Sequence, residues 1–424
     1  MGTGGRAMAA VDATAGAAED SARPTYAGNM LIHRLKISGM LSFGQEGIDL
    51  PMEPLNVLIG PNGSGKSNFI EALALLQAAP RDLSAPVKRM GGISEWLWKG
   101  DGAQGGATLD AVIGYPEGTM PLRHEMTFCQ TGEQFEIIFE TVENEPSTTD
   151  EIDTDLHYLY LRGNPSISEV DYETRGRYRL RNLGHGTLIR DASILSQRED
   201  PDRYPALAWL QQQYRQIKLY RNWEFGPDAG LRRSPRADEP SAFLTERGEN
   251  LPLVLSKLRG DRRQTLVKSL QQLYDGIEDF QVEVGGGRAE LFIVERGAGE
   301  RYIPASRLSD GTLRYMALAA ILLDPEPPPL VVIEEPELGL HPDVVLGIGE
   351  MLVEASKRTQ LVITTHSRTL IDALHDQPSS VVVCEKHDGK SIFERLEPAP
   401  LKKWLDKYSL GNLWSAGDLG GNRW

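Results

Sequence analysis

Short apolar runs separated by glycine-rich or polar stretches recur along the chain, and their spacing predicts strands and helices in alternation. Residues 31–37 have the apolar spacing of a strand, and residues 55–59 form a short apolar run that fits a buried strand. Glycines follow at once, and residues 68–76 then have the composition of a helix. The first structural unit is therefore predicted to be a strand, a glycine-rich loop and a helix.

The pattern predicts further strands in the middle of the chain. Residues 107–139 alternate with Gly and Pro turns in the manner of antiparallel strands, and similar segments recur at 156–162 and 178–183. Residues 280–284 and 289–295 flank three consecutive glycines. That arrangement predicts a hairpin which returns the chain to its first unit.

Two longer segments predict helices. Residues 203–223 and 251–277 are long enough for helices, and the Pro- and Arg-rich stretch at 227–240 between them fits an irregular loop. Neither helix has a sustained heptad pattern, so no long coiled coil is expected.

Composition changes this picture little. With 424 residues, 40 % of them hydrophobic, the chain can bury a large core and has room for two structural units. Cys129 and Cys384 lie far apart without metal-binding spacing, which gives no support to disulfides or a Cys-based zinc site and indicates a reducing compartment, the cytoplasm. No apolar run is long enough to span a membrane, so no membrane partner is expected. The formal charge of -15 argues against coating of nucleic acid by the whole surface, and any DNA contact must be local.

The same pattern predicts how the chain is divided. Residues 1–28 are rich in Gly, Ala and Ser and lack the basic start and apolar core of a signal peptide, so we expect a disordered leader. The remaining predicted parts are a first half-head at 29–145, an inserted α+β lid at 146–279, a second half-head at 280–395 and a tail at 396–424.

A phosphate-binding loop lies between the first predicted strand and helix. The pattern G-x-x-x-x-G-K-[ST] is matched in full by Gly60, Pro61, Asn62, Gly63, Ser64, Gly65, Lys66 and Ser67. In such a loop the backbone N–H groups face the phosphates, Lys66 meets the β and γ oxygens, and the Ser67 hydroxyl ligates Mg²⁺. The loop, together with the adjacent Asn68, predicts binding of ATP and Mg²⁺.

Two carboxylates end a later apolar strand. Residues 330–333 lead into Glu334 and Glu335, and the segment resembles a Walker B motif in which Glu334 stands where Asp is usual. In this interpretation Glu334 holds Mg²⁺ directly or through water, and Glu335 polarises the attacking water. An acidic pair after a strand is by itself more often a solvated strand end, but its position after the phosphate loop favours the catalytic interpretation.

Two further motifs flank that strand. Ser309, Asp310 and Gly311 precede an apolar helix and resemble an ABC signature with Asp-Gly in place of Gly-Gly; Ser309 and the following amides would cap a γ-phosphate. Alone, the segment would be better explained as a helix N-cap, with Ser309 or Asp310 starting the helix. Residues 361–365 form another buried strand, which delivers His366 to the same sheet edge in the position of a switch histidine that senses the γ-phosphate. The order of all four motifs favours the ATPase interpretation.

Together the motifs resemble the RecF and SMC class of ABC ATPases and, within it, stand-alone AAA-type ATPases related to RecF and to the ATPase half of OLD-type nucleases. The resemblance covers residues 31–144 and 281–386. It implies an α/β P-loop head with a mixed sheet flanked by helices, and ATP hydrolysis with Glu335, His366 and Lys66 as catalytic residues. It also implies a homodimer in which Ser309 of one copy closes over ATP held by the other, with residues 338–342 at the seam.

The chain departs from this class in two places. The segment between Ser67 and Ser309 lacks the heptads of an SMC coiled coil, so a compact lid is expected. The chain after His366 is too short for the TOPRIM nuclease of OLD-type proteins. Its aromatic, Gly-rich tail resembles tails of ATPases found beside small partner proteins in phage-defence operons.

These features predict an ATP-gated dimeric switch, either a defence ATPase working with a separate nuclease or effector, or a RecF-like repair ATPase that binds DNA directly. A transporter ATPase is disfavoured by the large insertion within the head. A scaffold that binds ATP without turnover is suggested by the Glu334 and Asp310 departures, but Glu335 favours turnover.

Two assignments stay open. The Q-loop glutamine is either Gln77 or Gln104. One group of cations is either a local DNA-backbone surface or a solvated helix face: Arg232, Arg233, Arg236, Lys257, Arg259, Arg262, Arg263 and Lys268.

Overall fold

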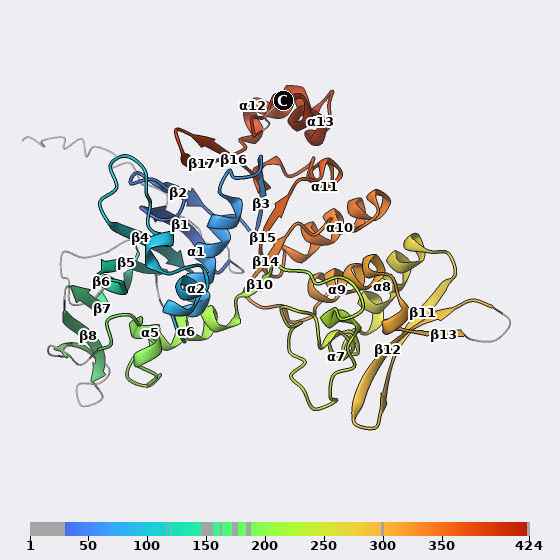
Figure 1. The fold of residues 1–424 in the computed structure, drawn as a ribbon, viewed down its shortest axis with the longest axis horizontal. Coiled ribbons are helices and arrows are strands. Elements are labelled where there is room, and N and C mark those ends of the chain that lie inside the picture. Colours follow the sequence, from blue (N-terminus) through green and yellow to red (C-terminus); the bar gives the residue numbers. More distant parts are fainter. Residues whose placement is uncertain are drawn as a thin grey trace, which may run out of the picture.

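The computed structural model describes residues 30–116, 118, 120–145, 156–161, 163–171, 177–183, 188–297 and 301–421. The expected leader at 1–28 and the last tail residues, 422–424, lie outside the described residues. Three sheets and their surrounding helices form the part of the chain that is described (Figure 1). No helix in that part is long and apolar enough to cross a membrane.

A six-stranded sheet at the centre of the molecule joins the start of the chain to its end (Figure 1). Its strands are β10 (Lys218–Tyr220), β14 (Leu330–Glu334), β15 (Gln360–Thr365), β3 (Leu55–Ile59), β16 (Val381–His387) and β17 (Lys390–Arg395), in that spatial order. All neighbours are parallel except β16 and β17. Parallel strands buried on both faces need nearly continuous apolar sequence, which explains the apolar runs at β3, β14 and β15.

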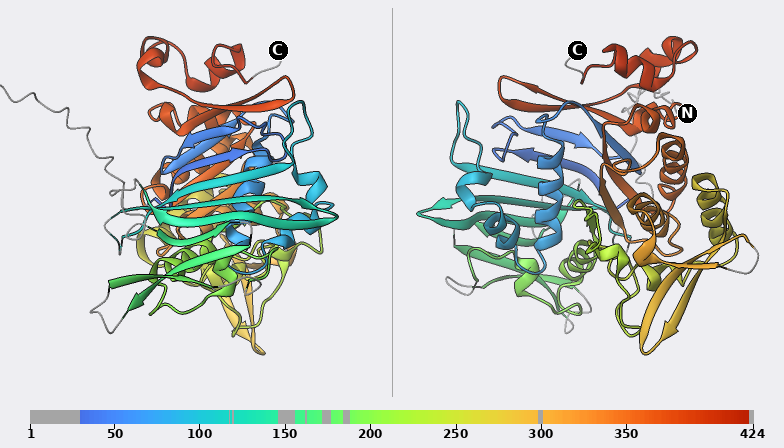
Figure 2. Two further views of the ribbon diagram at one scale, coloured as in Figure 1. Left: turned by 90° about the vertical axis from the view of Figure 1, so that its left-hand side faces the viewer. Right: turned by 45° about the vertical axis from the view of Figure 1, so that its right-hand side comes forward.

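An eight-stranded antiparallel sheet lies beside the central sheet (Figure 2). Its spatial order is β2 (Ile48–Pro51), β1 (Ile32–Ser38), β4 (Gly106–Ile113), β5 (Leu122–Thr131), β6 (Gln134–Asn144), β7 (Leu156–Leu161), β8 (Asn164–Asp171) and β9 (Arg177–Asn182). Because β6 pairs with β7, this sheet continues past residue 145, where the inserted lid was expected to begin.

Helix α1 (Lys66–Ala78) lies between these two sheets (Figure 2). Its Phe69 and Leu73 share one buried core with Leu35 of β1 and Leu109 of β4. The remaining helices of this half are α2 (Ser84–Arg89), α3 (Ile93–Trp96), α5 (Ile194–Gln197) and α6 (Pro205–Gln216). Trp96 of α3 is fully buried in the core of this half.

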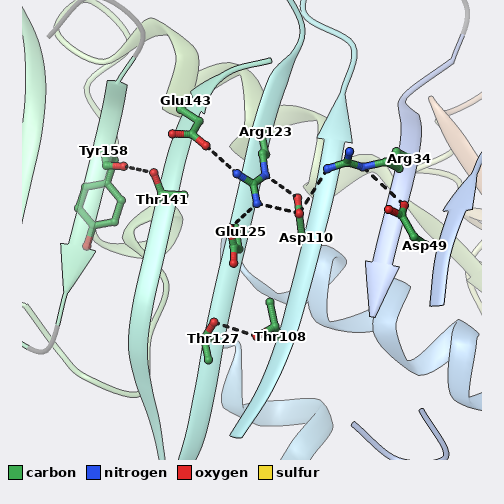
Figure 3. Close-up of polar contacts among 10 residues, drawn as sticks. All are labelled: Arg34, Asp49, Thr108, Asp110, Arg123, Glu125, Thr127, Thr141, Glu143 and Tyr158. Carbon is green, nitrogen blue, oxygen red and sulfur yellow. Dashed lines mark hydrogen bonds and ion pairs between the residues drawn. The ribbon is translucent and has the colours of Figure 1, made fainter. Parts of the chain in front are cut away.

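The face of the eight-stranded sheet that points away from α1 is polar (Figure 3). Arg123 Nη2 lies 2.9 Å from Asp110 Oδ2, and Arg123 Nη1 lies 3.0 Å from Glu143 Oε1, so one guanidinium links three strands. Arg34 Nη2 reaches Asp110 from β1 at 3.4 Å. Cross-strand pairs of opposite charge fix the register of this sheet, whose outer face is not covered by any helix of the described part of the chain.

The other half of the molecule is a helical layer with a projecting hairpin (Figure 1). Its elements are α7 (Leu251–Leu255), α8 (Gly260–Leu273), β11 (Ile277–Gly285), β12 (Arg288–Glu295), β13 (Arg301–Pro304), α9 (Asp310–Leu322) and α10 (Pro342–Ala355), with short 3-10 turns at Gly230–Arg232, Ala305–Arg307 and Pro378–Ser380. The predicted hairpin is confirmed, and its turn places Gly286 and Gly287 at φ 59° and 78°, where glycine is favoured.

Both long helices predicted in the middle are wrong in part. The segment 203–223 contains α6 and then β10, because residues 218–220 hydrogen-bond to the edge of β14 in parallel. The segment 251–277 divides into α7 and α8, since Arg259 adopts an extended conformation and α8 begins anew at Gly260. A three-residue strand is too short to show periodicity in sequence.

The tail packs back onto the head. Helix α13 (Leu410–Ala416) contacts α11 (Arg368–Asp372), where the Gly411 N–H donates to Asp372 Oδ1 at 2.8 Å. Helix α12 (Pro398–Leu405) has no buried residue. The Gly421 N–H donates to Glu385 Oε1 at 2.7 Å, which holds the last described residue against β16.

Candidate functional site

The phosphate loop follows β3 and has a shape that only glycine permits at two positions. Gly60 and Gly65 have φ 149° and 105°. A Cβ at Gly60 would lie 2.1 Å from the carbonyl oxygen of Cys384, and one at Gly65 would lie 2.2 Å from Ser391 Oγ. The loop is therefore fixed between α1 and the last two strands of the central sheet.

Lys66 is folded over this loop. Its Nζ donates to the carbonyl oxygens of Gly60 at 2.7 Å and Pro61 at 3.1 Å. Burial lowers the pKa of the Lys66 ammonium. Ser64 Oγ is buried and has no partner among the described residues. A cation and an unpartnered hydroxyl beside a glycine loop fit a phosphate chain, which would offer both groups acceptors.

Ser67 and Glu334 meet across the site. Ser67 Oγ donates to Glu334 Oε1 at 2.6 Å, so the two residues predicted to hold Mg²⁺ are in direct contact. A hydroxyl and a carboxylate are the hard oxygen donors that Mg²⁺ prefers. The described residues contain no group of three His, Cys, Asp or Glu that could hold a metal alone. The other ligands of an Mg²⁺ here would be phosphate oxygens and water.

Glu335 has a constrained backbone. Its φ of 47° lies in the left-handed region, which is rare for a residue with a Cβ. The Glu335 N–H donates to the Thr364 carbonyl oxygen at 3.0 Å, while its own carbonyl accepts a hydrogen bond from Arg314 Nη2. The partners on both sides hold the conformation and thereby the direction of the carboxylate.

His366 lies next to Glu335. Its Nε2 is 3.8 Å from Glu335 Oε1. Burial, and then the charge of Lys66, lower the pKa of the imidazole, which favours its neutral form near pH 7.

Glu337 is a site residue whose role sequence analysis missed. Its Oε1 accepts hydrogen bonds from Thr365 Oγ1 at 2.7 Å and from the His366 N–H at 2.9 Å, so it fixes the turn that carries His366. Its Oε2 is buried without a partner among the described residues. The available signal in the sequence was that Glu337 is the third acid in the run that starts at Glu334.

One cavity of about 140 Å³ collects most of the predicted residues. It is lined by Asn62, Gly63, Gly65, Lys66, Ser67, Asn68, Glu334, Glu335, Thr364 and His366. Gly60, Pro61 and Ser64 form the adjoining part of the loop. The Asn68 amide also donates to Ser42 Oγ at 2.7 Å.

The predicted signature residues, Ser309, Asp310 and Gly311, lie outside this cavity. Ser309 caps α9, its Oγ accepting from the Thr312 N–H at 3.1 Å. Asp310 pairs with Arg232 Nη2 at 2.6 Å, which lowers the pKa of the Asp310 carboxyl. Among the described residues that line the 140 Å³ cavity, none is Ser309, Asp310 or Gly311. One chain therefore does not bring the signature onto its own phosphate loop.

Arg232 was grouped with the possible DNA-binding cations, and that grouping is wrong for it. Its guanidinium also donates to the carbonyl oxygens of Gly226, Ala305, Ser306 and Leu308, so it is committed to the signature loop.

Several other cations of that group are paired with acids. Arg233 lies 3.0 Å from Glu249, and Arg236 lies 2.8 Å from Asp238. Arg263 lies 2.9 Å from Asp279. These pairs reduce the positive charge available for a phosphate backbone.

The two Q-loop candidates have different surroundings. Gln77 Nε2 donates to the Ile217 carbonyl at 2.8 Å and so links α1 to the start of β10. Gln104 is exposed. Neither residue lines the 140 Å³ cavity formed by the described residues.

Comparison with known sequences agrees with this geometry. Residues 55–372 match the family model AAA_21, described as "AAA domain, putative AbiEii toxin, Type IV TA system". The chain is 25 % identical over 373 residues to the uncharacterized protein YbjD of Escherichia coli K12, covering 81 % of this chain and 59 % of that protein. A 73-residue match, 16 % of this chain and 12 % of the relative, is 37 % identical to the Old nuclease of Escherichia phage P2. The chain thus spans 59 % or less of the length of these relatives.

Solved SMC head domains have the same fold. One bound to the C-winged helix domain of ScpA superposes with a TM-score of 0.50 at 16 % identity, covering 87 % of this chain and 99 % of that one. A Pyrococcus furiosus head with an extended coiled coil gives 0.51 at 14 % identity, covering 89 % and 99 %. In the described part of this chain the longest helices, α8 and α10, have 14 residues, so the expected fold without a long coiled coil is confirmed. The family match, the order of the motifs and the head fold together show that this chain belongs to the AAA_21 family and has the SMC-like head fold of AAA/ABC-type ATPases.

Proposed function

We propose that the protein hydrolyses ATP as a dimeric switch, in which ATP closes two heads face to face and hydrolysis releases them. The observation that carries this proposal is the separation of the site: Lys66, Glu335 and His366 line one cavity, while Ser309 of the same chain does not. A second copy can supply the missing signature. The exposed Leu338, beside the Walker B strand, belongs to the segment expected at the seam between copies.

Each residue has a defined task in this proposal. Lys66 exchanges its loop carbonyls for phosphate oxygens, and Ser67 and Glu334 would hold Mg²⁺. Mg²⁺ would neutralise charge on the phosphates. Glu335 accepts the proton of the water that attacks the γ-phosphorus, as the bond to the ADP oxygen breaks. Neutral His366 contacts the γ-phosphate and reports its departure through the turn held by Glu337.

Glu335→Gln tests the chemistry. Phosphate release and mass by light scattering are measured for the wild type and the variant, with and without ATP. We expect wild-type turnover, and in Glu335→Gln a loss of hydrolysis with accumulation of an ATP-bound dimer, because glutamine cannot accept the proton. A wild-type protein that neither hydrolyses ATP nor changes mass would overturn the proposal.

Mixing two inactive variants tests the shared site. Lys66→Ala removes the phosphate contact and Ser309→Arg blocks the signature, so each homodimer has no intact site. A random mixture should recover measurable activity, at most about a quarter of the wild-type value, since half of its dimers carry one intact site of two. No recovery, despite mixed dimers detected by mass, would place the signature outside the partner's site.

We propose that the biological setting is antiviral defence in the cytoplasm, as an ATPase subunit working with a separate effector. Support comes from the family description, which names a toxin of a toxin–antitoxin system, and from the relative named a nuclease, of which this chain covers 12 %. The net charge of -15 and the paired arginines favour a protein partner over direct DNA binding.

Phage plating on cells that carry the native locus tests this setting. The wild-type locus should lower plating efficiency, and Glu335→Gln at the same locus should abolish that protection. Unchanged plating, together with DNA binding that weakens steeply with salt, would instead support the RecF-like repair function.

A further inference from the structure

Arg314 belongs to helix α9, which begins directly after Ser309. Its side chain is fully buried. The guanidinium donates through Nη2 to the Glu335 carbonyl oxygen and lies over two aromatic rings, 4.9 Å from the Trp223 centroid and 5.5 Å from that of Phe225. It thus joins the signature helix to the backbone of the predicted catalytic glutamate.

This arginine is costly to bury. Its Nε and Nη1 have no hydrogen-bond partner among the described residues. Burial lowers the pKa of Arg314 to about 10, although the charges of Glu337 and Glu335 act in the opposite direction. A buried cation with unsatisfied donors is poor for stability, and a hydrophobic side chain of similar volume commonly serves a core equally well. A contribution to stability therefore does not explain why an arginine occupies this position.

The contact with Glu335 fixes an unfavourable backbone. The left-handed conformation of Glu335, φ 47°, persists because the Thr364 carbonyl accepts its N–H, and because Arg314 and the Leu338 N–H, at 3.1 Å, both donate to its carbonyl. Without Arg314 the Leu338 N–H alone holds that carbonyl, so the direction of the carboxylate is less firmly fixed. The position of α9 is thereby transmitted to the group that accepts the proton from water.

The aromatic rings tie the same contact to the signature loop. Trp223 and Phe225 precede Gly226, whose N–H donates to the Asp310 carboxylate at 3.2 Å. Arg232, from the next turn of the same segment, also pairs with Asp310. The segment from Trp223 to Arg232 therefore holds both the loop that would meet the partner's nucleotide and the guanidinium that holds Glu335.

We propose that Arg314 is a positioning residue that couples the two ATP sites of the dimer. When Ser309 docks on the nucleotide of the partner, α9 and Arg314 set Glu335 for hydrolysis in their own subunit's site. This inference rests on the proposed dimeric function. It assigns to Arg314 a role in turnover and in communication between sites, and none in ATP binding.

Arg314→Met, Arg314→Lys and a control, Arg358→Met, test this role. Arg358 donates to the carbonyl oxygen of Leu322 at the other end of α9 and does not line the 140 Å³ cavity. We expect Arg314→Met to lower kcat at least about tenfold, since small misplacements of a reacting group cost up to about a hundredfold. ATP affinity should stay within about twofold and the melting temperature should not fall. Arg314→Lys, which keeps one donor for Glu335, should recover part of kcat.

Cooperativity gives a second readout. The dependence of wild-type hydrolysis on ATP should be sigmoidal, and in Arg314→Met it should become hyperbolic because the two sites no longer communicate. Wild-type kcat in Arg314→Met, or a parallel loss of kcat, ATP affinity and melting temperature, would overturn the inference. Failure of the wild type to hydrolyse ATP would instead refute the proposed function, so the two failures are distinguishable.

Discussion

Ser67 donates a hydrogen bond to Glu334 across 2.6 Å, although the two residues lie 267 positions apart in the sequence. Ser67 lies in the first turn of α1 and Glu334 ends β14, and β15 lies between β3 and β14 in the sheet. The contact therefore depends on the register of three parallel strands. It joins the two residues predicted to hold Mg²⁺.

This pair predicts how hydrolysis depends on Mg²⁺. Ser67→Ala removes one oxygen ligand, and Glu334→Asp withdraws the carboxylate by one methylene. Both should raise the Mg²⁺ concentration for half-maximal hydrolysis, Ser67→Ala by about tenfold, because Mg²⁺ demands near-ideal geometry. Titration of phosphate release with MgCl₂ measures the effect. Ser415→Ala, at an exposed site, is the control and should match the wild type.

Substitution of Arg232 should lower kcat more than substitution of Arg233. Arg232→Lys loses the planar fork that reaches Asp310 and several loop carbonyls, so the signature loop should loosen and kcat should fall about tenfold. Nucleotide binding to the monomer should not change. Arg233→Lys, at an exposed pair with Glu249, is the matched control and should keep full activity. Equal effects of the two substitutions would contradict the assignment of Arg232 to the signature loop.

His366 should give the protein a defined pH dependence. Its pKa lies below the ordinary 6.5, so in the window between the lowered pKa and 6.5 the unfolded chain binds a proton that the folded protein does not. Stability from this group is therefore complete above pH 6.5 and decreases as the pH falls through that window. Urea unfolding at pH 5.5 and 7.5 should show a smaller difference for His366→Gln than for the wild type. A larger difference in the variant would reverse the sign that burial predicts.

Substitution of the buried Gln360 should lower the stability of the fold strongly. Its buried amide accepts from the Ile32 N–H at 2.9 Å and donates to the Ile32 carbonyl at 2.7 Å, joining the central sheet to the antiparallel sheet. Gln360→Leu leaves these buried groups unpaired and should lower the free energy of unfolding by about 2–5 kcal/mol. Chemical denaturation measures this. Gln272→Leu, on the exposed face of α8, should change stability by less than about 0.5 kcal/mol.

The fold class and the four motifs could be predicted from sequence because each depends on local pattern and chain order. The phosphate loop needs glycines at fixed spacing, and the buried parallel strands need apolar runs. These constraints act on neighbouring residues, so they are visible in one sequence. The central sheet, its companion helices and the hairpin at 280–295 follow from them.

What sequence could not reveal are partners far apart in the chain. Arg232 is an ordinary member of a basic cluster until the structure places Asp310, 78 positions later, within 2.6 Å of it. The role of Arg314 likewise depends on Trp223 and on the Glu335 carbonyl, and a carbonyl has no sequence signal. Strand β10 is visible only because β14 offers it an edge.

The central position of β3 also has a consequence for synthesis on the ribosome. The strand that leads into the phosphate loop leaves the ribosome early, but its two neighbours, β15 and β16, begin at Gln360 and Val381. Until those residues emerge, β3 has both edges open and the loop lacks its packing against Cys384 and Ser391. The nascent chain therefore cannot complete a nucleotide site during most of translation, and shielding of this early apolar strand falls to the antiparallel sheet and to chaperones.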